Sequence, residues 1–164
     1  MAEYISFQPS DYFNTTLYSG NGTAIGSGGN AITGVGFQPD FTWIKQRDGV
    51  DNHILTDAVR GATKYVNSDR TNAEATNAES LTTWGADGFT LGNHAAVNGS
   101  GDTFASWNWK ESTTSKCDIV QYSGTGSAQT IAHNLGVKPD LIFIKRTDTT
   151  SNWIVYHQSL GATK

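Results

Sequence analysis

Four histidines are the side chains of this 164-residue chain best suited to acid–base chemistry or metal binding. No two of them stand at the His-x-x-x-His spacing that places two imidazoles on one face of a helix. They are His53, His94, His133 and His157. We therefore expect structural or surface roles for the histidines, and the sequence predicts no metal site.

Carboxylates could serve a hydrolase, which needs an acid pair or a nucleophile with its base. The aspartates stand beside glycine, proline or polar turn residues, where a carboxylate typically caps a turn: Asp40, Asp48, Asp87 and Asp102. The sequence has no Gly-x-Ser-x-Gly elbow and no phosphate-binding glycine loop. Two oxygen-rich loops, 48–52 and 98–102, could offer calcium ligands, but neither follows the calcium-loop pattern and tight turns explain both. The sequence predicts no catalytic residues, no cofactor and no enzyme.

Aromatic side chains are better pointers to binding, because indole rings stack on sugar faces and anchor interfaces. Trp84 lies in a polar segment, and Trp153 aligns with His53 in the internal repeat described below. Both are predicted ligand contacts, with core or edge packing as an equal alternative. Arg60 is a third candidate ligand contact, although an ion pair with Asp57 is its simplest explanation.

The composition indicates that these residues belong to an all-β protein. Eighteen glycines, three prolines and 16% charged residues describe many turns and few long helices. A net charge of −4 with scattered basic residues argues against nucleic acid as a partner. We also expect no membrane insertion and no signal peptide, because no apolar run approaches the roughly 20 residues of a membrane span. Cys117 is the only cysteine, so stability must come from burial rather than from a disulfide.

An internal repeat organises the chain. Residues 36–64 align without a gap with residues 136–164, and twelve of the 29 positions are identical, whereas unrelated segments would share roughly two. The identical positions in the first copy are Gly36, Pro39, Asp40, Ile44, Lys45, Asp48, Asn52, Ile54, Gly61, Ala62, Thr63 and Lys64. Upstream, residues 17–22 correspond to 121–126 after a four-residue slip in a Gly/Ser loop, which tolerates such changes.

The repeat predicts an N-terminal segment (1–10), a first β-sandwich module (11–110), a linker (111–116) and a partial second module (117–164) that repeats 18–64. Half a sandwich exposes an apolar face. The second copy must therefore pack on the first, pair with another chain or continue in a longer protein. We favour truncation of the second copy.

Strands are expected in runs that are rich in aromatic and β-branched residues. These runs are 41–44, 53–55, 88–92, 104–110, 141–144 and 153–156. In the fourth run Trp107 and Trp109 share one face, which suggests core packing, and the exchange of Trp43 for Phe143 between the copies suggests the same. Residues 72–79 have some helix propensity but no apolar stripe, so we expect an exposed loop or a helical turn.

Five segments, YSGNG, GVGFQPDFTWIK, HILTDAVRGATKY, LTTWGADGFTLG and VNGSGDTFASWNWK, together span most of the chain. With these segments in this order, the chain resembles repeat-containing tail or appendage proteins of marine bacteriophages. The resemblance implies a lectin-like or jelly-roll β-sandwich that is carried on a virion and attaches to glycans of the host surface. The resemblance identifies no binding residues in this chain.

We therefore expect a virion structural protein, a tail-fibre or appendage component involved in host attachment. Its expected partners are other virion proteins, further copies of itself, with a trimer favoured, and host surface glycan. Repetition fits this function, because several weak contacts combine through effective concentration. The alternative is a capsid-decorating or tail-connecting protein without glycan binding, and a less favoured third function is a glycan-degrading enzyme.

Overall fold

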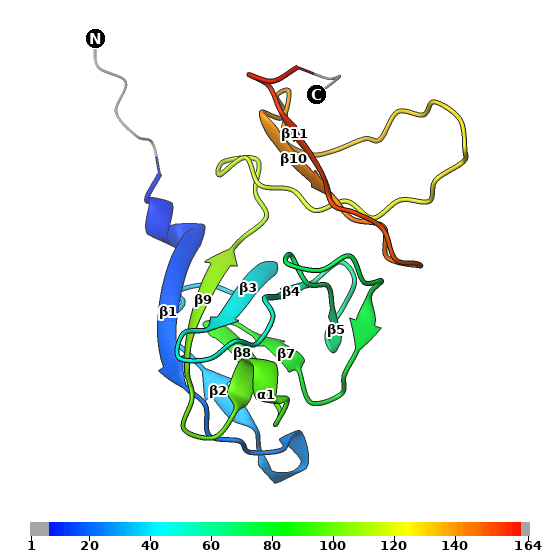
Figure 1. The fold of residues 1–164 in the computed structure, drawn as a ribbon. Coiled ribbons are helices and arrows are strands. Elements are labelled where there is room, and N and C mark those ends of the chain that lie inside the picture. Colours follow the sequence, from blue (N-terminus) through cyan, green and yellow to red (C-terminus); the bar gives the residue numbers. More distant parts are fainter. Residues whose placement is uncertain (1–6, 162–164) are drawn as a thin grey trace.

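The computed structural model describes residues 7–161, and the fold of these residues is mostly β, in several small antiparallel sheets with one short α-helix (Figure 1). The expected β-rich class is confirmed at this level. The predicted segment 1–10 and the end of the repeated Gly-Ala-Thr-Lys lie largely outside the described residues. The strands are β1 (Phe13–Ser19), β2 (Asn30–Ile32), β3 (Phe41–Gln46), β4 (Ile54–Asp57), β5 (Lys64–Tyr65), β6 (Ala75–Thr76), β7 (Leu81–Gly85), β8 (Gly88–Leu91), β9 (Thr103–Trp109), β10 (Leu141–Ile144) and β11 (Ile154–His157). The helix is α1 (Ala95–Asn98), and η1 (Pro9–Asp11) and η2 (Ile25–Ser27) are short 3-10 helices.

A four-stranded sheet in the order β1-β9-β3-β4 is the frame of the first module (Figure 1). β9 pairs with β1 on one edge and with β3 on the other, so the last strand of the module lies between two earlier ones. Aromatic and β-branched residues fill these strands, as their β propensity predicts. The sheet is complete only once the chain has reached Trp109.

The core draws on this sheet and on a three-stranded sheet in the order β2-β8-β7. One cluster of buried apolar side chains draws on both sheets and on α1: Ile44, Ile54 and Phe104 from the first sheet, Ile32, Leu81, Phe89 and Leu91 from the second, and Val97 from α1. Each such side chain contributes roughly 1.5–3 kcal/mol relative to exposure. This cluster is therefore the main source of stability in the first module.

A buried asparagine on α1 connects two loops and strand β2 to the core. Asn98 is fully buried, and its Nδ2 donates to the carbonyl of Gly92 at 2.8 Å. Its Oδ1 accepts from the backbone N–H of Asn21 at 2.9 Å and from Asn30 Nδ2 at 2.8 Å. Because both ends of this amide are used, α1 is held in place by hydrogen bonds although it is only four residues long.

The alternation predicted for residues 104–110 is present in β9, but the predicted direction is wrong. Ser106 and Asn108 are fully buried on the inner face, whereas Trp107 and Trp109 are half-buried on the outer face. Trp43 on β3 also lies on the outer face, in register with Trp107. Alternation defines two faces of a strand, and only the packing of a second sheet decides which of them is inside.

The second copy repeats the β3–β4 hairpin as β10–β11. Lys145 Nζ donates to the carbonyls of Arg146 and Ser151, as Lys45 Nζ does to the corresponding loop of the first copy. The retained Ile-Lys pair is thus explained, because the lysine closes the hairpin loop after each strand. The copy touches the first module at this loop, where Ser151 N–H donates to the Thr71 carbonyl at 2.9 Å.

Residues 72–79 and α1 differ from the sequence prediction. The segment 72–79 contains β6, which pairs with β5, and ends in a hydrogen-bonded turn in which Ser80 N–H donates to the Asn77 carbonyl at 3.0 Å. The backbone N–H of Glu74 donates to the Thr147 carbonyl at 2.9 Å, so this segment also contacts the second copy. The one α-helix of the described residues, α1, is only four residues long and has no periodic signal in the sequence.

Candidate functional site

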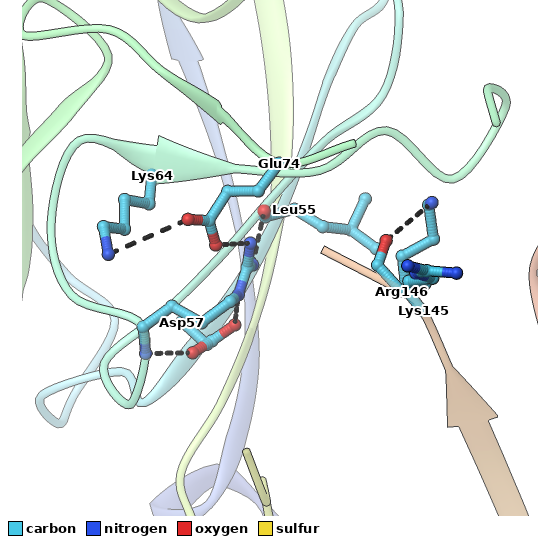
Figure 2. Close-up of polar contacts among 7 residues, drawn as sticks. Leu55, Asp57, Lys64, Glu74, Lys145 and Arg146 are labelled. Atoms are coloured by element: carbon cyan, nitrogen blue, oxygen red, sulfur yellow. Dashed lines mark hydrogen bonds and ion pairs between the residues drawn. The ribbon is translucent and has the colours of Figure 1, made fainter. Parts of the chain in front are cut away.

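The predicted ion pair between Arg60 and Asp57 is present, within a larger buried cluster (Figure 2). The Arg60 side chain is 9% exposed, and its Nε donates to Asp57 Oδ2. Its Nη1 donates to Glu74 Oε2 at 3.3 Å and its Nη2 to the Leu55 carbonyl at 3.0 Å. Lys64 Nζ lies 3.7 Å from the other oxygen of Glu74. The guanidinium therefore connects β4 and the turn after it to Glu74, the residue before β6. A ligand contact through Arg60 stays a prediction, and the burial of the side chain argues against it.

Trp84, the second predicted ligand contact, lies on β7 and packs against the core cluster. Its indole Nε1 is buried and finds no hydrogen-bond partner among the described residues. This placement favours the packing alternative for Trp84.

Trp153, the third, lies where the second copy meets the first. Its Nε1 donates to the Asn67 carbonyl at 2.9 Å, and the side chain lines an open recess of about 420 Å³ together with residues 68–72. Asp69 and Arg70 are the charged residues of this recess. Neither Trp84 nor Arg60 lines it, so the structure does not bring the three predicted residues together.

A second aromatic surface lies on the outer face of the four-stranded sheet. Trp109 on the central strand β9 faces Phe13 on one neighbouring strand and Phe41 on the other. Two residues along β9, on the same face, Trp107 faces Trp43. We call this surface the aromatic face; its members are Phe13 on β1, Phe41 and Trp43 on β3, and Trp107 and Trp109 on β9. Successive rows of one sheet face adjoin, so the five rings form one continuous surface.

The rings of the aromatic face hold one another in place. The ring centroids of Trp109 lie 4.9 Å from Phe13 and 5.2 Å from Phe41, and those of Trp43 and Trp107 are 6.5 Å apart at an angle of 73°. These separations fall in the range of favourable aromatic pairs. Trp43 Nε1 also donates to His53 Nδ1 at 2.8 Å, which fixes the indole plane.

The aromatic face remains in contact with solvent. Phe13, at the sheet edge, is 39% exposed, and the other four rings are half-buried. Leu17 and Lys45 flank the face in the next row of the sheet. The alternation in 104–110 is the sequence signal for this surface, but the core packing expected from the shared face of Trp107 and Trp109 is wrong, because the polar residues between them are the buried ones.

Comparison with known proteins assigns the chain to a family. A family model described as a domain of unknown function, DUF7483, matches residues 8–164. The chain belongs to this family. No curated protein matches it, and no solved structure does. Because the matched span includes the first module and the second copy, the hairpin β10–β11 is part of the DUF7483 domain.

Carboxylates of this DUF7483 domain mostly organise loops. Asp87 accepts the backbone N–H groups of Gly34 and Gly36 at 3.0 and 2.6 Å, and these bonds lower its pKa. The Glu79 carboxylate accepts the N–H groups of Asn93 and Ile25 at 3.0 and 2.9 Å, which lowers its pKa in the same way. These aspartate and glutamate side chains cap loops that are distant in sequence rather than only their own turns.

Among residues 7–161, no group of three or more His, Cys, Asp or Glu side chains is placed to hold a metal ion. The same residues include no helix with the length and hydrophobicity that crossing a membrane requires.

Proposed function

We propose that this DUF7483 domain is a structural component of a bacteriophage virion, part of a tail fibre or other appendage, and that its aromatic face contacts glycans of the host surface. The observation that carries the proposal is the aromatic face itself, five adjoining rings on one side of a sheet. Monomeric proteins seldom leave such a surface without a partner. The virion location rests on the resemblance of the repeated motifs to phage appendage proteins.

Ring stacking on a shallow face gives weak binding per copy. Sugar rings present C–H surfaces that pack against indole and phenyl rings, and amphipathic aromatics dominate such contacts. Several copies acting together raise the apparent affinity by effective concentration. A homo-oligomer, which we propose to be a trimer, would present several aromatic faces to one polysaccharide.

We also propose that the first module is a β-sandwich of the jelly-roll or lectin-like kind. The core cluster supports this proposal, because it takes side chains from the four-stranded and the three-stranded sheet. In such an architecture one side of a sheet is packed inside and the other is free for a ligand.

A glycan array tests the binding function. The chain would be biotinylated, assembled on tetravalent streptavidin and applied to an array of bacterial polysaccharides. We expect binding that falls at least about fivefold in Phe13→Ala and in Trp107→Ala, which corresponds to about 1 kcal/mol of contact. Tyr122→Ala is the matched control, since Tyr122 is an aromatic residue that is 47% exposed and lies outside the aromatic face.

Two outcomes of the glycan array would contradict the proposed binding function. If variants keep the unfolding temperature of the unaltered chain and bind equally well, the aromatic face is not the binding surface. If no polysaccharide gives a signal above background, attachment through glycans is excluded for this set.

The exposed apolar hairpin β10–β11 favours a second function, a capsid-decorating or tail-connecting protein that binds only other virion proteins. Leu141, Phe143 and Val155 are all exposed there. A protein partner would cover such strands more readily than a sugar would. Absence of glycan binding combined with stoichiometric assembly with a second purified virion protein would favour this function.

A further inference from the structure

The hairpin β10–β11 reproduces β3–β4 in pairing as well as in sequence. Ile144 pairs with Ile154 as Ile44 pairs with Ile54, one hundred positions earlier. The next bond of the ladder is also repeated: Gln158 N–H donates to the carbonyl of Asp140 at 2.9 Å, and Ala58 N–H donates to that of Asp40 at 2.8 Å. What surrounds β3 in the first module therefore indicates what fits around β10.

The surroundings of the two hairpins differ at one edge. β3 has β4 on one side and β9 on the other, whereas among residues 7–161 the only strand beside β10 is β11. Residues 118–123, which align with most of β1, form no strand; this is expected, because β1 pairs only with β9. The inner faces of the two hairpins differ as well: Ile54 is 2% exposed because it packs in the core cluster with side chains of the three-stranded sheet, whereas its counterpart Ile154 is 59% exposed.

Backbone hydrogen bonds show which groups of β10 face this open edge. The first copy supplies the pattern. Just after β3, Arg47 N–H donates to the Thr103 carbonyl at 2.7 Å, which places the odd-numbered residues of β3 in bonds with β9. The bond from Ala58 to the Asp40 carbonyl places the carbonyls of even-numbered residues towards β4; only the N–H of Asp40, which lies just before β3, departs from this pattern and donates to the Trp109 carbonyl of β9 at 2.8 Å. Bonded residues alternate along an antiparallel strand. By the same parity, the backbone N–H and C=O groups of Leu141 and Phe143 point to the open edge of β10.

We propose that the open edge of β10 is an acceptor site for one added strand of the β9 type, antiparallel to β10 and supplied by a polypeptide segment that is not already in a sheet. The pairing of β3 with β9 defines the occupant's pattern: aromatic residues opposite Leu141 and Phe143, separated by small or polar residues. β9 of a second copy is not this occupant, because it is already bonded on both edges. Strand addition supplies main-chain bonds for affinity and alternate side chains for specificity.

One position of the occupant should differ from β9. Thr42 faces Asn108 in the first module, and its counterpart in β10 is Ile142. In the first module Asn108 Nδ2 donates to the Asn14 carbonyl on β1 and to Ser106. Because residues 118–123 form no strand, the partner on β1 has no counterpart in the second copy, and an apolar residue in place of the asparagine would match this site better. The proposed strand addition rests on the internal repeat, so its test is independent of the proposed glycan binding.

Tethering the strand to the full chain tests the proposal. The sequence Thr-Phe-Ala-Ser-Trp-Val-Trp-Lys, which is residues 103–110 with Val for Asn108, would follow Lys164 through a Gly/Ser linker of 38 residues. That length equals residues 65–102, the separation between Lys64 and Thr103 in the first copy. A matched version carries Pro in place of Trp107, which removes the N–H that faces the acceptor strand.

Amide hydrogen exchange measured by NMR gives the readout. We expect the N–H groups of Leu141 and Phe143 to exchange at least about tenfold more slowly with the Val strand than with the Pro strand. The N–H groups of Ile142 and Ile144, which face β11, should change far less. Equal exchange of Leu141 and Phe143 in the two proteins would overturn the proposal, and so would equal slowing of all four amides.

Discussion

Replacement of Arg60 by leucine, the residue at the equivalent position of the second copy, is expected to destabilise the first module strongly. The guanidinium bonds to Asp57, Glu74 and the Leu55 carbonyl, and the Asp57 and Glu74 side chains are only 7% and 18% exposed. Arg60→Leu leaves these acceptors buried without their cation. Breaking a buried pair on one side costs about 3–5 kcal/mol.

The unfolding temperature converts this estimate into a measurement. For a chain of this length 1 kcal/mol shifts the midpoint by about 2–4 °C, so Arg60→Leu should lower it by about 6–20 °C. The matched control is Arg146→Leu, because Arg146 forms an ion pair with Asp148 whose side chains are 59% and 70% exposed. An exposed pair contributes about 0–1 kcal/mol, so the control should shift by less than about 4 °C.

A double-mutant cycle separates the pair from general disruption at the site. Asp57→Asn combined with Arg60→Leu removes the carboxylate that Arg60→Leu alone leaves without its cation. The loss of unfolding free energy in the double variant should therefore be smaller, by at least about 1 kcal/mol, than the sum of the losses in the two single variants. Urea unfolding followed by tryptophan fluorescence gives the free energies. Equal losses for Arg60→Leu and Arg146→Leu, or additive losses in the cycle, would refute the assignment of Arg60 to a buried structural cluster.

Three further predictions follow from the polar contacts. The lowered pKa values of Glu79 and Asp87 mean that their stabilisation is present near neutral pH and is lost as the pH falls below about 4.5 towards their folded-state pKa values. Glu79→Gln and Asp87→Asn should therefore each flatten the acid limb of a plot of unfolding free energy against pH; an unchanged limb would contradict this. Burial and the neighbouring carboxylates raise the pKa of the Cys117 thiol to about 11. Because iodoacetamide reacts with the thiolate, it should modify Cys117 at pH 8 on the order of a hundredfold more slowly in the folded chain than in the urea-unfolded chain. Comparable rates in the two states would be inconsistent with the structure. Asn98→Ala should reduce the free energy of unfolding by about 2–4 kcal/mol, because it leaves several buried groups unpaired; a loss below 1 kcal/mol in urea unfolding would show that α1 is held by other means.

The sequence predicted local features of this fold well. The internal repeat predicted that 141–144 and 153–156 would match the first copy, and their register is the same. The pair of Arg60 with Asp57 was also predicted, since both lie in one turn. Each of these features depends on residues that are close in the chain, where residue type and spacing determine the geometry.

Features that depend on distant segments were not predictable in the same way. The central place of β9 between β1 and β3 has no local signature, because its partners lie far back in the chain. The aromatic face was missed for a related reason: buried Ser106 and Asn108 face a second sheet, and alternation alone does not say which side that sheet covers. The burial of Arg60 likewise depends on Glu74, which lies outside the repeated segment.

NMR titration of the five indole N–H signals with the polysaccharide that binds most strongly on the array tests the central claim most directly. The chain supplies its own control, since Trp84 Nε1 is buried in the core. We expect the signals of Trp107 and Trp109 to shift with a common dissociation constant while that of Trp84 stays in place. A shift of Trp153 alone would move the binding site to the recess between the two copies, and the absence of any shift at Trp107 and Trp109 would contradict attachment through the aromatic face.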